Sequence, residues 1–191
     1  MGRKSRSKKE RSNTEQQWEL RAKAPAAPSA FLRLALVFAV LVILFELVVE
    51  KMVDMTLLQL ATASVTTALL QFTGMEVLTN GINMTLPNVQ WEIIRECTAI
   101  RAQVVFIAFV LAYPASIRAK SLAVAAGVPF LFAANIIRLV ALGWLTYFSP
   151  ALASYCHDFV WQMGFLFLVI GMWLAWIEWV VNGEKQPAVP A

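Results

Sequence analysis

The chain is organised around residues 91–113, WEIIRECTAIRAQVVFIAFVLAY, where a polar stretch with strand-like alternation changes into a long apolar run. Up to Ile93, apolar and polar side chains alternate with the period of a strand. The run from about Thr98 to Tyr113 has the composition of a membrane helix, although it is slightly short. Cys97 stands between the two segments. The sequence therefore places a thiol at the end of a predicted membrane helix.

The composition indicates that the solvent of this chain is a lipid bilayer. Of its 191 residues, 59% are hydrophobic, which is too apolar for an ordinary soluble domain. The formal charge of +4 is uneven, because a basic cluster precedes the first apolar run. The cluster consists of Arg3, Lys4, Arg6, Lys8, Lys9, Arg11, Arg21 and Lys23. We interpret residues 1–30 as a mobile tail held in the cytoplasm and not as a nucleic-acid binding segment.

Apolar runs predict about four membrane-spanning helices. They are Phe31–Val49, Thr98–Tyr113, Leu122–Phe148 and Phe159–Val181. The first run is expected to remain as an anchor, because charged residues follow it where a signal peptide has a small-residue cleavage site.

Two further segments are expected at the outer surface. Met55–Phe72 is interrupted by polar residues, and if it spanned the bilayer it would leave Arg118 and Lys120 outside, against the charge bias of the N-terminal tail. We therefore expect a re-entrant or surface helix. Asn80-Gly81 is a favoured hairpin dipeptide. The predicted fold class is an all-α integral membrane protein with about four spans, this extra helix and a small extracytoplasmic β-hairpin.

This topology gathers three polar residues at one face of the bilayer. With the N-terminus in the cytoplasm, Cys97 and His157 lie at the outer ends of their spans, and Arg138 lies inside the third span near its outer end. We expect a multi-pass protein of the inner (plasma) membrane with its site on the extracytoplasmic face. Residues 31–181 form the expected membrane-embedded catalytic domain, and residues 182–191 a cytoplasmic tail.

The three residue types suit acyl transfer through a thioester. An ionisable group inside a spanning helix costs a few kcal/mol on insertion scales, which makes Arg138 a functional candidate. Its charge favours the Cys97 thiolate and stabilises an oxyanion, and His157 moves protons near neutral pH. Asn135, three residues before Arg138, is placed to hold the guanidinium or a substrate carbonyl. Arg101, one turn beyond Cys97, is a candidate second cation or a contact for substrate carboxylates.

These residues resemble the exosortase/archaeosortase family of membrane transpeptidases, and most closely its compact exosortase H-like branch. The resemblance covers about Phe31–Val181. It is carried by Cys97-Thr98-Ala99-Ile100, Asn135-Ile136-Ile137-Arg138-Leu139, His157 and Gly164. The family often has glycine where this chain has Ala99, and its common members are longer.

The resemblance implies a function and a set of partners. Cys97, Arg138 and His157 match the family's proposed catalytic set, each at the outer end of a helix. Such enzymes cut membrane-anchored proteins that end in a sorting signal, made of a short motif, a spanning helix and a basic cluster. They transfer the new C-terminus to a surface acceptor. No cofactor and no metal are expected, and the single histidine cannot build a typical zinc site.

Two other functions remain open at this point. Cys97 and Cys156 are the only cysteines and are predicted on the same oxidising side, so they suit a thiol oxidoreductase or a structural disulfide. Neither belongs to a Cys-x-x-Cys pair, and redox chemistry gives Arg138 no task. A non-enzymatic scaffold in envelope assembly leaves all three polar residues incidental.

Overall fold

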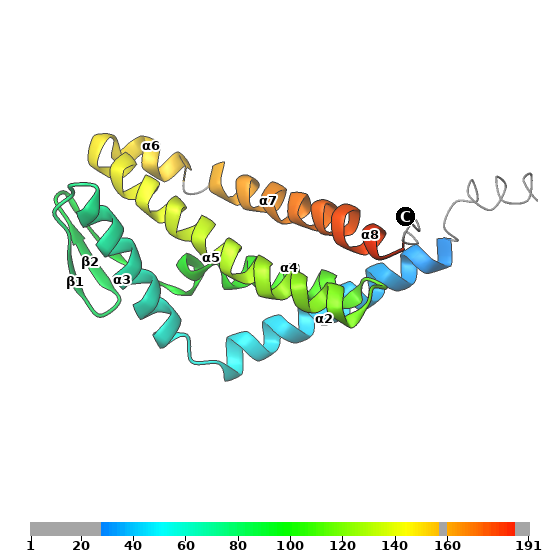
Figure 1. Ribbon diagram of the computed structural model, residues 1–191. Helices are drawn as coiled ribbons and strands as arrows, with labels where there is room; N and C mark the ends of the chain where they lie inside the picture. Colours follow the sequence, from blue (N-terminus) through cyan, green and yellow to red (C-terminus); the bar gives the residue numbers. More distant parts are fainter. Residues whose placement is uncertain (1–27, 157–159, 186–191) are drawn as a thin grey trace, which may run out of the picture.

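The computed structural model describes residues 28–156 and 160–185, which are mostly helical and include one small sheet (Figure 1). The helices are α2 (Pro28–Met52), α3 (Thr56–Phe72), the 3-10 helix η1 (Arg95–Thr98), α4 (Ile100–Ala112), α5 (Ile117–Phe148), α6 (Pro150–Tyr155), α7 (Trp161–Trp176), the π-helical turn η3 (Ile177–Val181) and α8 (Asn182–Lys185). The strands are β1 (Leu78–Asn80), β2 (Asn83–Leu86) and β3 (Val89–Glu92), and they lie between α3 and η1 in the chain.

Among the described residues, three helical segments are long and apolar enough to cross a membrane. They are Phe31–Met52, Ile117–Phe148 and Trp161–Val181. At about 1.5 Å per residue each exceeds the roughly 30 Å of a hydrocarbon core. No residue of the first segment is buried inside the molecule, as expected of a helix whose side chains face lipid. The predicted all-α membrane fold is confirmed.

The predicted second span is shorter than expected. Its helix, α4, has 13 residues, or about 20 Å, and so falls short of a full bilayer. The helix cannot start before Ile100 because Ala99 has a left-handed backbone, with φ of 59°. The helix ends at Ala112, because Tyr113 has the extended backbone that the following Pro114 favours. Helix α4 packs instead against α2, α5 and α7.

The predicted hairpin is present and is extended by a third strand. All neighbours are antiparallel in the order β1-β2-β3. Asn80 pairs with Asn83, so the turn is centred on Gly81-Ile82 and not on Asn80-Gly81. Gly81 has φ of 65°, which matches the glycine of a type II′ turn. Pro87 does not interrupt a strand, because it lies in the turn between the Leu86–Val89 pair.

The sheet has one apolar face, and α3 covers it. Cross-strand partners point to the same face, and the buried Met84 and Leu86 lie with Ile93 on the apolar one. They share a core cluster with Ala63 and Leu70 of α3. The predicted surface or re-entrant segment is therefore a helix, and it does not belong to the three candidate spans.

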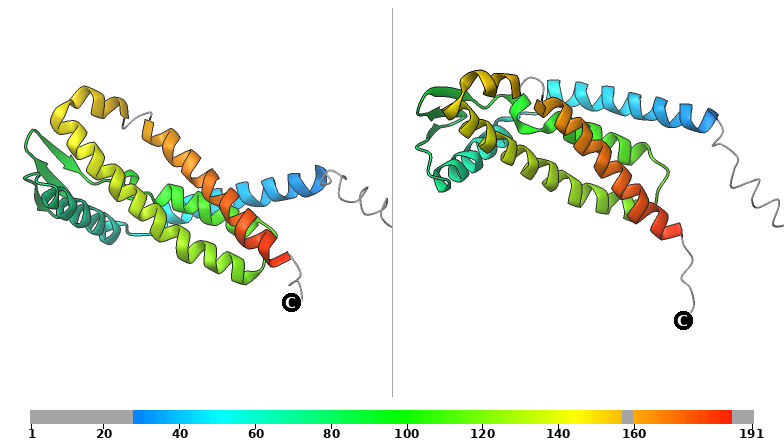
Figure 2. Two further views of the ribbon diagram at one scale, coloured as in Figure 1. Left: turned by 45° about the horizontal axis from the view of Figure 1, so that its top comes forward. Right: turned by 90° about the horizontal axis from the view of Figure 1, so that it is seen from above.

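The elements divide between two ends of the molecule. Figures 1 and 2 show the sheet, α3 and α6 at one end, whereas the start of α2, the first turns of α5 and α8 lie at the other. Helices α5 and α7 run between the ends and are joined by few contacts with each other. The described ends of the chain therefore lie on the same side of the molecule.

Candidate active site

Cys97 lies in a tight backbone junction just ahead of α4. Its N–H donates to the carbonyl of Ile94 at 3.0 Å, and the Thr98 hydroxyl donates to the carbonyl of Arg95 at 2.7 Å. The left-handed Ala99 backbone described above then turns the chain into α4. Thr98 is fully buried, whereas Cys97 is half-buried. This junction fixes the backbone and leaves the thiol accessible.

Asn135 connects this junction to α5. Its side-chain N–H donates to the carbonyl oxygen of Cys97 at 2.6 Å, and its own oxygen accepts from Arg138 Nη1 at 3.3 Å. Asn135 is completely buried, so both hydrogen bonds are shielded from water. The contact between Asn135 and Arg138 that the three-residue spacing predicts is present, and it brings Arg138 toward the cysteine.

Arg138 is hydrogen-bonded to Asn135 through Nη1, and a second donor of its guanidinium, Nε, is unpaired among the described residues. Its Nε is buried and has no hydrogen-bond partner in the part of the chain that the structure describes. Its guanidinium carbon lies 5.9 Å from the centre of the Phe165 ring of α7, within range of a cation–π contact. A buried charged donor without a partner is costly. Arg138 can therefore offer a hydrogen bond to a group that enters the site.

A cavity of about 460 Å³ opens beside Cys97, a volume typical of ligand sites. Its walls come from β3 with the residues after it, from α5 and from α6. The lining residues are Val89, Gln90, Trp91, Glu92, Ile93, Ile94, Cys97, Leu139, Leu142, Thr146, Pro150, Ala153 and Ser154. Most of these side chains are apolar. The cavity therefore suits a largely apolar ligand next to the thiol.

Burial raises the pKa of the Cys97 thiol above its ordinary value. The hydrogen bond with Ile94 and the charge of Arg138 both act to lower this pKa, and Glu96 acts to raise it. The effect that we expected of Arg138 thus has the predicted sign, but burial outweighs it. Because the neutral thiol is favoured, nucleophilic chemistry at Cys97 needs a base.

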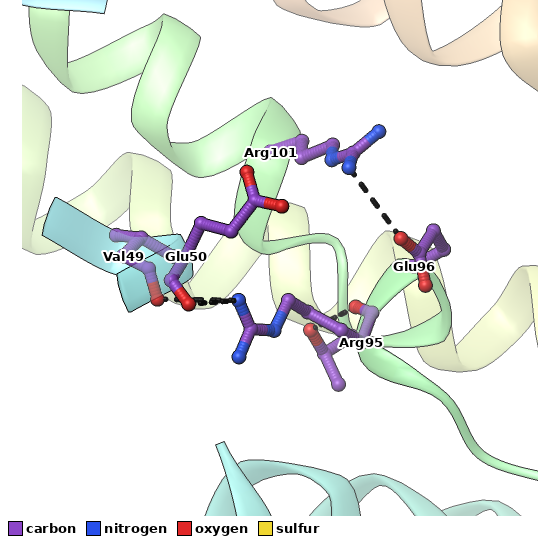
Figure 3. A network of polar contacts seen from close by, with 6 residues as sticks. Val49, Glu50, Arg95, Glu96 and Arg101 are labelled. Carbon is purple, nitrogen blue, oxygen red and sulfur yellow. Dashed lines mark hydrogen bonds and ion pairs between the residues drawn. The ribbon is translucent and has the colours of Figure 1, made fainter. Parts of the chain in front are cut away.

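Arg101 does not line this cavity. Its guanidinium pairs with Glu96 at 3.4 Å, and both side chains are more than half exposed (Figure 3). Together with Glu46 and Glu50 it lines a separate recess of about 200 Å³ beside the end of α2. The structure therefore separates this candidate cation from Arg138.

The remaining predicted residues are described only in part. His157 lies outside the described residues. Cys156 is half-buried, and Cys97 and Cys156 are both free thiols in this structure. Of the predicted set, the structure thus brings together Cys97, Asn135 and Arg138.

Arg95 helps to position η1, which contains Cys97, and the sequence did not predict this role. Its Nη1 donates to the carbonyls of Val49 at 3.3 Å and Glu50 at 3.1 Å, in the last turn of α2 (Figure 3). These carbonyls lack partners within their own helix, and a cation there also complements the helix dipole. Arg95 thereby ties η1 to α2. Nothing in the local sequence indicates a contact between residues 45 positions apart.

The part of the cavity wall formed by α5 was partly predictable from the sequence. Leu139, Leu142 and Thr146 follow Arg138 at helical spacing and lie on one side of α5. The opposite wall, from Trp91 and Ile94, depends on how the sheet packs, which the spacing of residues does not show.

The comparisons agree with the membrane fold. No curated protein and no solved structure matches the chain. The family model described as transmembrane exosortase (Exosortase_EpsH) matches residues 26–177, which is most of the chain. The match includes the first two candidate spans and all of the third except residues 178–181. The chain therefore belongs to the transmembrane exosortase family.

Proposed function

We propose that this protein is a membrane-embedded cysteine transpeptidase that cleaves the C-terminal sorting signals of exported proteins. Exosortases are a protease and transpeptidase family, which supports the general activity. The proposed partners are membrane-anchored proteins that end in a short motif, a spanning helix and a basic tail. Residues 31–181 form the proposed catalytic domain, in the inner membrane, between cytoplasmic tails at 1–30 and 182–191.

One observation carries the proposal: Cys97 borders an apolar cavity, and the buried Asn135 links its carbonyl to Arg138. A nucleophile, a space for a polypeptide and a cation are thus assembled from segments about 40 residues apart. A purely structural arginine is usually satisfied by its neighbours, whereas Arg138 Nε has no described partner.

The first half of the proposed reaction forms a thioester. His157 takes the proton of the Cys97 thiol, and the thiolate attacks the carbonyl carbon of the scissile peptide bond. Arg138 stabilises the oxyanion of the tetrahedral intermediate by its charge and its free donor. The C–N bond then breaks, the leaving amine takes the proton from His157, and the C-terminal signal departs. The rest of the substrate remains bound to Cys97 as a thioester.

The second half releases the product. A surface acceptor with an amine or hydroxyl group, or water, loses a proton to His157 and attacks the thioester carbonyl. The C–S bond breaks and the proton returns to the thiolate, so the free thiol is restored. The result is a transferred C-terminus with an acceptor, or hydrolysis with water.

The test uses an exported protein of the host that carries a C-terminal motif, helix and basic tail, produced together with the enzyme. The change in mass of this precursor measures its cleavage. We expect Cys97→Ser and His157→Ala to abolish processing, and Arg138→Ala to slow it by about 10²- to 10³-fold, as for loss of an oxyanion donor. Cys156→Ser, the matched control, should process the precursor at the normal rate.

Other outcomes point to other functions. If Cys156→Ser is as inactive as Cys97→Ser, thiol exchange between the two cysteines replaces acyl transfer. If none of the four substitutions changes processing, the protein acts as a scaffold and the proposal is wrong.

A further inference from the structure

The sheet beside Cys97 has two edges, and they are not equivalent. The edge formed by β1 is tied to α3, because the Thr79 and Thr67 hydroxyls are hydrogen-bonded and Gln71 Nε2 donates to the carbonyl of Val77 just before β1. The edge formed by β3 borders the cavity, since all four residues of β3 line it together with Cys97. The β3 edge is therefore the one that faces the nucleophile.

The register of the sheet shows which backbone groups this edge presents. Ile93 N–H donates to the carbonyl of Ile82 at 2.8 Å, which makes these two residues a hydrogen-bonded pair. Hydrogen-bonded pairs recur at every second residue of an antiparallel ladder, so Trp91 and Val89 also bond to β2. Gln90 and Glu92 alternate with them. Their backbone groups point away from β2.

These outward groups have the chemistry that binds a polypeptide backbone. The N–H and C=O of Gln90 and the N–H of Glu92 face an edge where the described part of the chain offers no strand to pair with them. The Glu92 carbonyl is already used, because it accepts from Ile94 N–H at 3.0 Å. Alternating unpaired donors and acceptors are the usual template for an added strand.

We propose that the substrate binds as an extended strand on the free edge of β3, which delivers its scissile bond to Cys97. This inference rests on the proposed function and adds how the polypeptide is held. Backbone hydrogen bonds to Gln90 and Glu92 supply affinity that does not depend on side chains. Alternate side chains of the bound segment face the wall formed by Leu139, Leu142 and Ala153, which selects apolar residues near the scissile bond.

Proline substitution tests the edge, because proline lacks the N–H. We expect Gln90→Pro to slow cleavage of the same precursor at least about fivefold, the effect of one lost hydrogen bond. The hydrogen bonds between β3 and β2 are preserved in this variant, because the Gln90 N–H points away from β2. Thr79→Pro is the control at the β1 edge, where it removes an outward N–H. It also loses the hydroxyl that bonds Thr67, so it is compared with Thr79→Ala, which loses only that hydroxyl. The two Thr79 variants should cleave the precursor within about twofold of each other. Gln90→Ala keeps the N–H and should cleave faster than Gln90→Pro.

A second measurement covers the case in which Gln90→Pro misfolds. A photo-crosslinking amino acid, p-benzoylphenylalanine, replaces either Gln90 or the exposed Leu78 of β1 in the Cys97→Ala enzyme, which should retain uncleaved precursor. We expect crosslinks to the precursor from position 90 and not from position 78. Normal cleavage by Gln90→Pro, or equal crosslinking from the two edges, overturns the proposal.

Failure of the proposed function and failure of strand addition give different results. If the proposed function is wrong, the Cys97→Ala enzyme accumulates no precursor. If only the strand-addition proposal is wrong, that enzyme accumulates precursor while Gln90→Pro still cleaves it at the normal rate.

Discussion

At the scale of the residue, Ala99 occupies a backbone conformation that glycine adopts more readily. Its φ of 59° is in the left-handed region, which costs a residue with a Cβ about 1 kcal/mol or more. We expect Ala99→Gly to be neutral or to stabilise the protein by up to about 1 kcal/mol, because glycine's larger unfolded-state entropy offsets part of the gain. Ala99→Val should destabilise it by roughly 1–3 kcal/mol. Thermal unfolding in detergent measures both, and equal stability of the two variants contradicts a left-handed backbone here.

A second residue-scale prediction concerns the charge beside the thiol. Thiolate is the form that iodoacetamide alkylates, and burial raises the pKa of Cys97, so alkylation should reach half its maximal rate at a pH above that of a free thiol. Arg138→Gln removes a charge that lowers this pKa, and the midpoint should move to still higher pH. The measurement is the alkylation rate against pH in a Cys156→Ser background.

Arg101→Gln is the matched control for this experiment. It also removes one positive charge, but from a side chain that pairs with Glu96 outside the cavity. Its midpoint should match that of the parent. A downward shift in Arg138→Gln, or equal shifts in both variants, contradicts the placement of Arg138 beside Cys97.

These residues also show what the sequence could and could not predict. The contact between Asn135 and Arg138 was predictable, because positions three apart on a helix are neighbours whatever the helix packs against. The left-handed Ala99 was not, since alanine carries no signal for that conformation. The bond from Arg95 to α2 joins distant segments and depends on tertiary packing alone.

At the scale of the element, the packing of α4 against α5 depends on Gly127. A Cβ at this position would collide with the ring of Phe106, which is 1% exposed. We expect Gly127→Ala to destabilise the protein by about 1–3 kcal/mol through overpacking. The higher helix propensity of alanine should offset up to about 1 kcal/mol of this loss. The measurement is thermal unfolding of the purified protein in detergent.

Gly171 on α7 provides the control for this helix contact. A Cβ added there meets nothing within 4 Å, so Gly171→Ala should leave the unfolding temperature unchanged or raise it. If Gly127→Ala is as stable as Gly171→Ala, α4 does not pack on α5 as closely as the structure has it.

The elements were predictable to different degrees. Long apolar runs identified α2, α5 and α7, because helices in lipid must satisfy their own backbone groups and so require about 20 apolar residues. The start of α4 was placed too early, since the same apolar composition continues through the junction at Thr98 and Ala99. The hairpin was predicted from Asn80-Gly81, but the pairing of β2 with β3 depends on the apolar face that α3 covers.

At the scale of the whole molecule, the arrangement of the two ends agrees with the proposed topology. The starts of α2 and α5 and the end of the described chain lie at one end, and the sheet lies at the other (Figure 2). The basic residues at the start of α5, Arg118 and Lys120, therefore share an end with the segment that follows the N-terminal basic tail. Positive charge marks the cytoplasmic side of membrane proteins.

The last prediction tests this orientation with a maleimide that does not cross membranes. In intact spheroplasts of a Cys156→Ser strain, we expect the reagent to label Cys97, because the half-buried thiol borders an open cavity at the proposed extracytoplasmic face. The matched control places the thiol at the other end: Ile117→Cys, at an 84% exposed position, in a Cys97→Ser and Cys156→Ser background. It should react only after lysis. If the Ile117→Cys thiol reacts in intact spheroplasts and Cys97 reacts only after lysis, the candidate active site faces the cytoplasm. Exported substrates are on that side only before they cross the membrane, so this result would contradict the proposed topology.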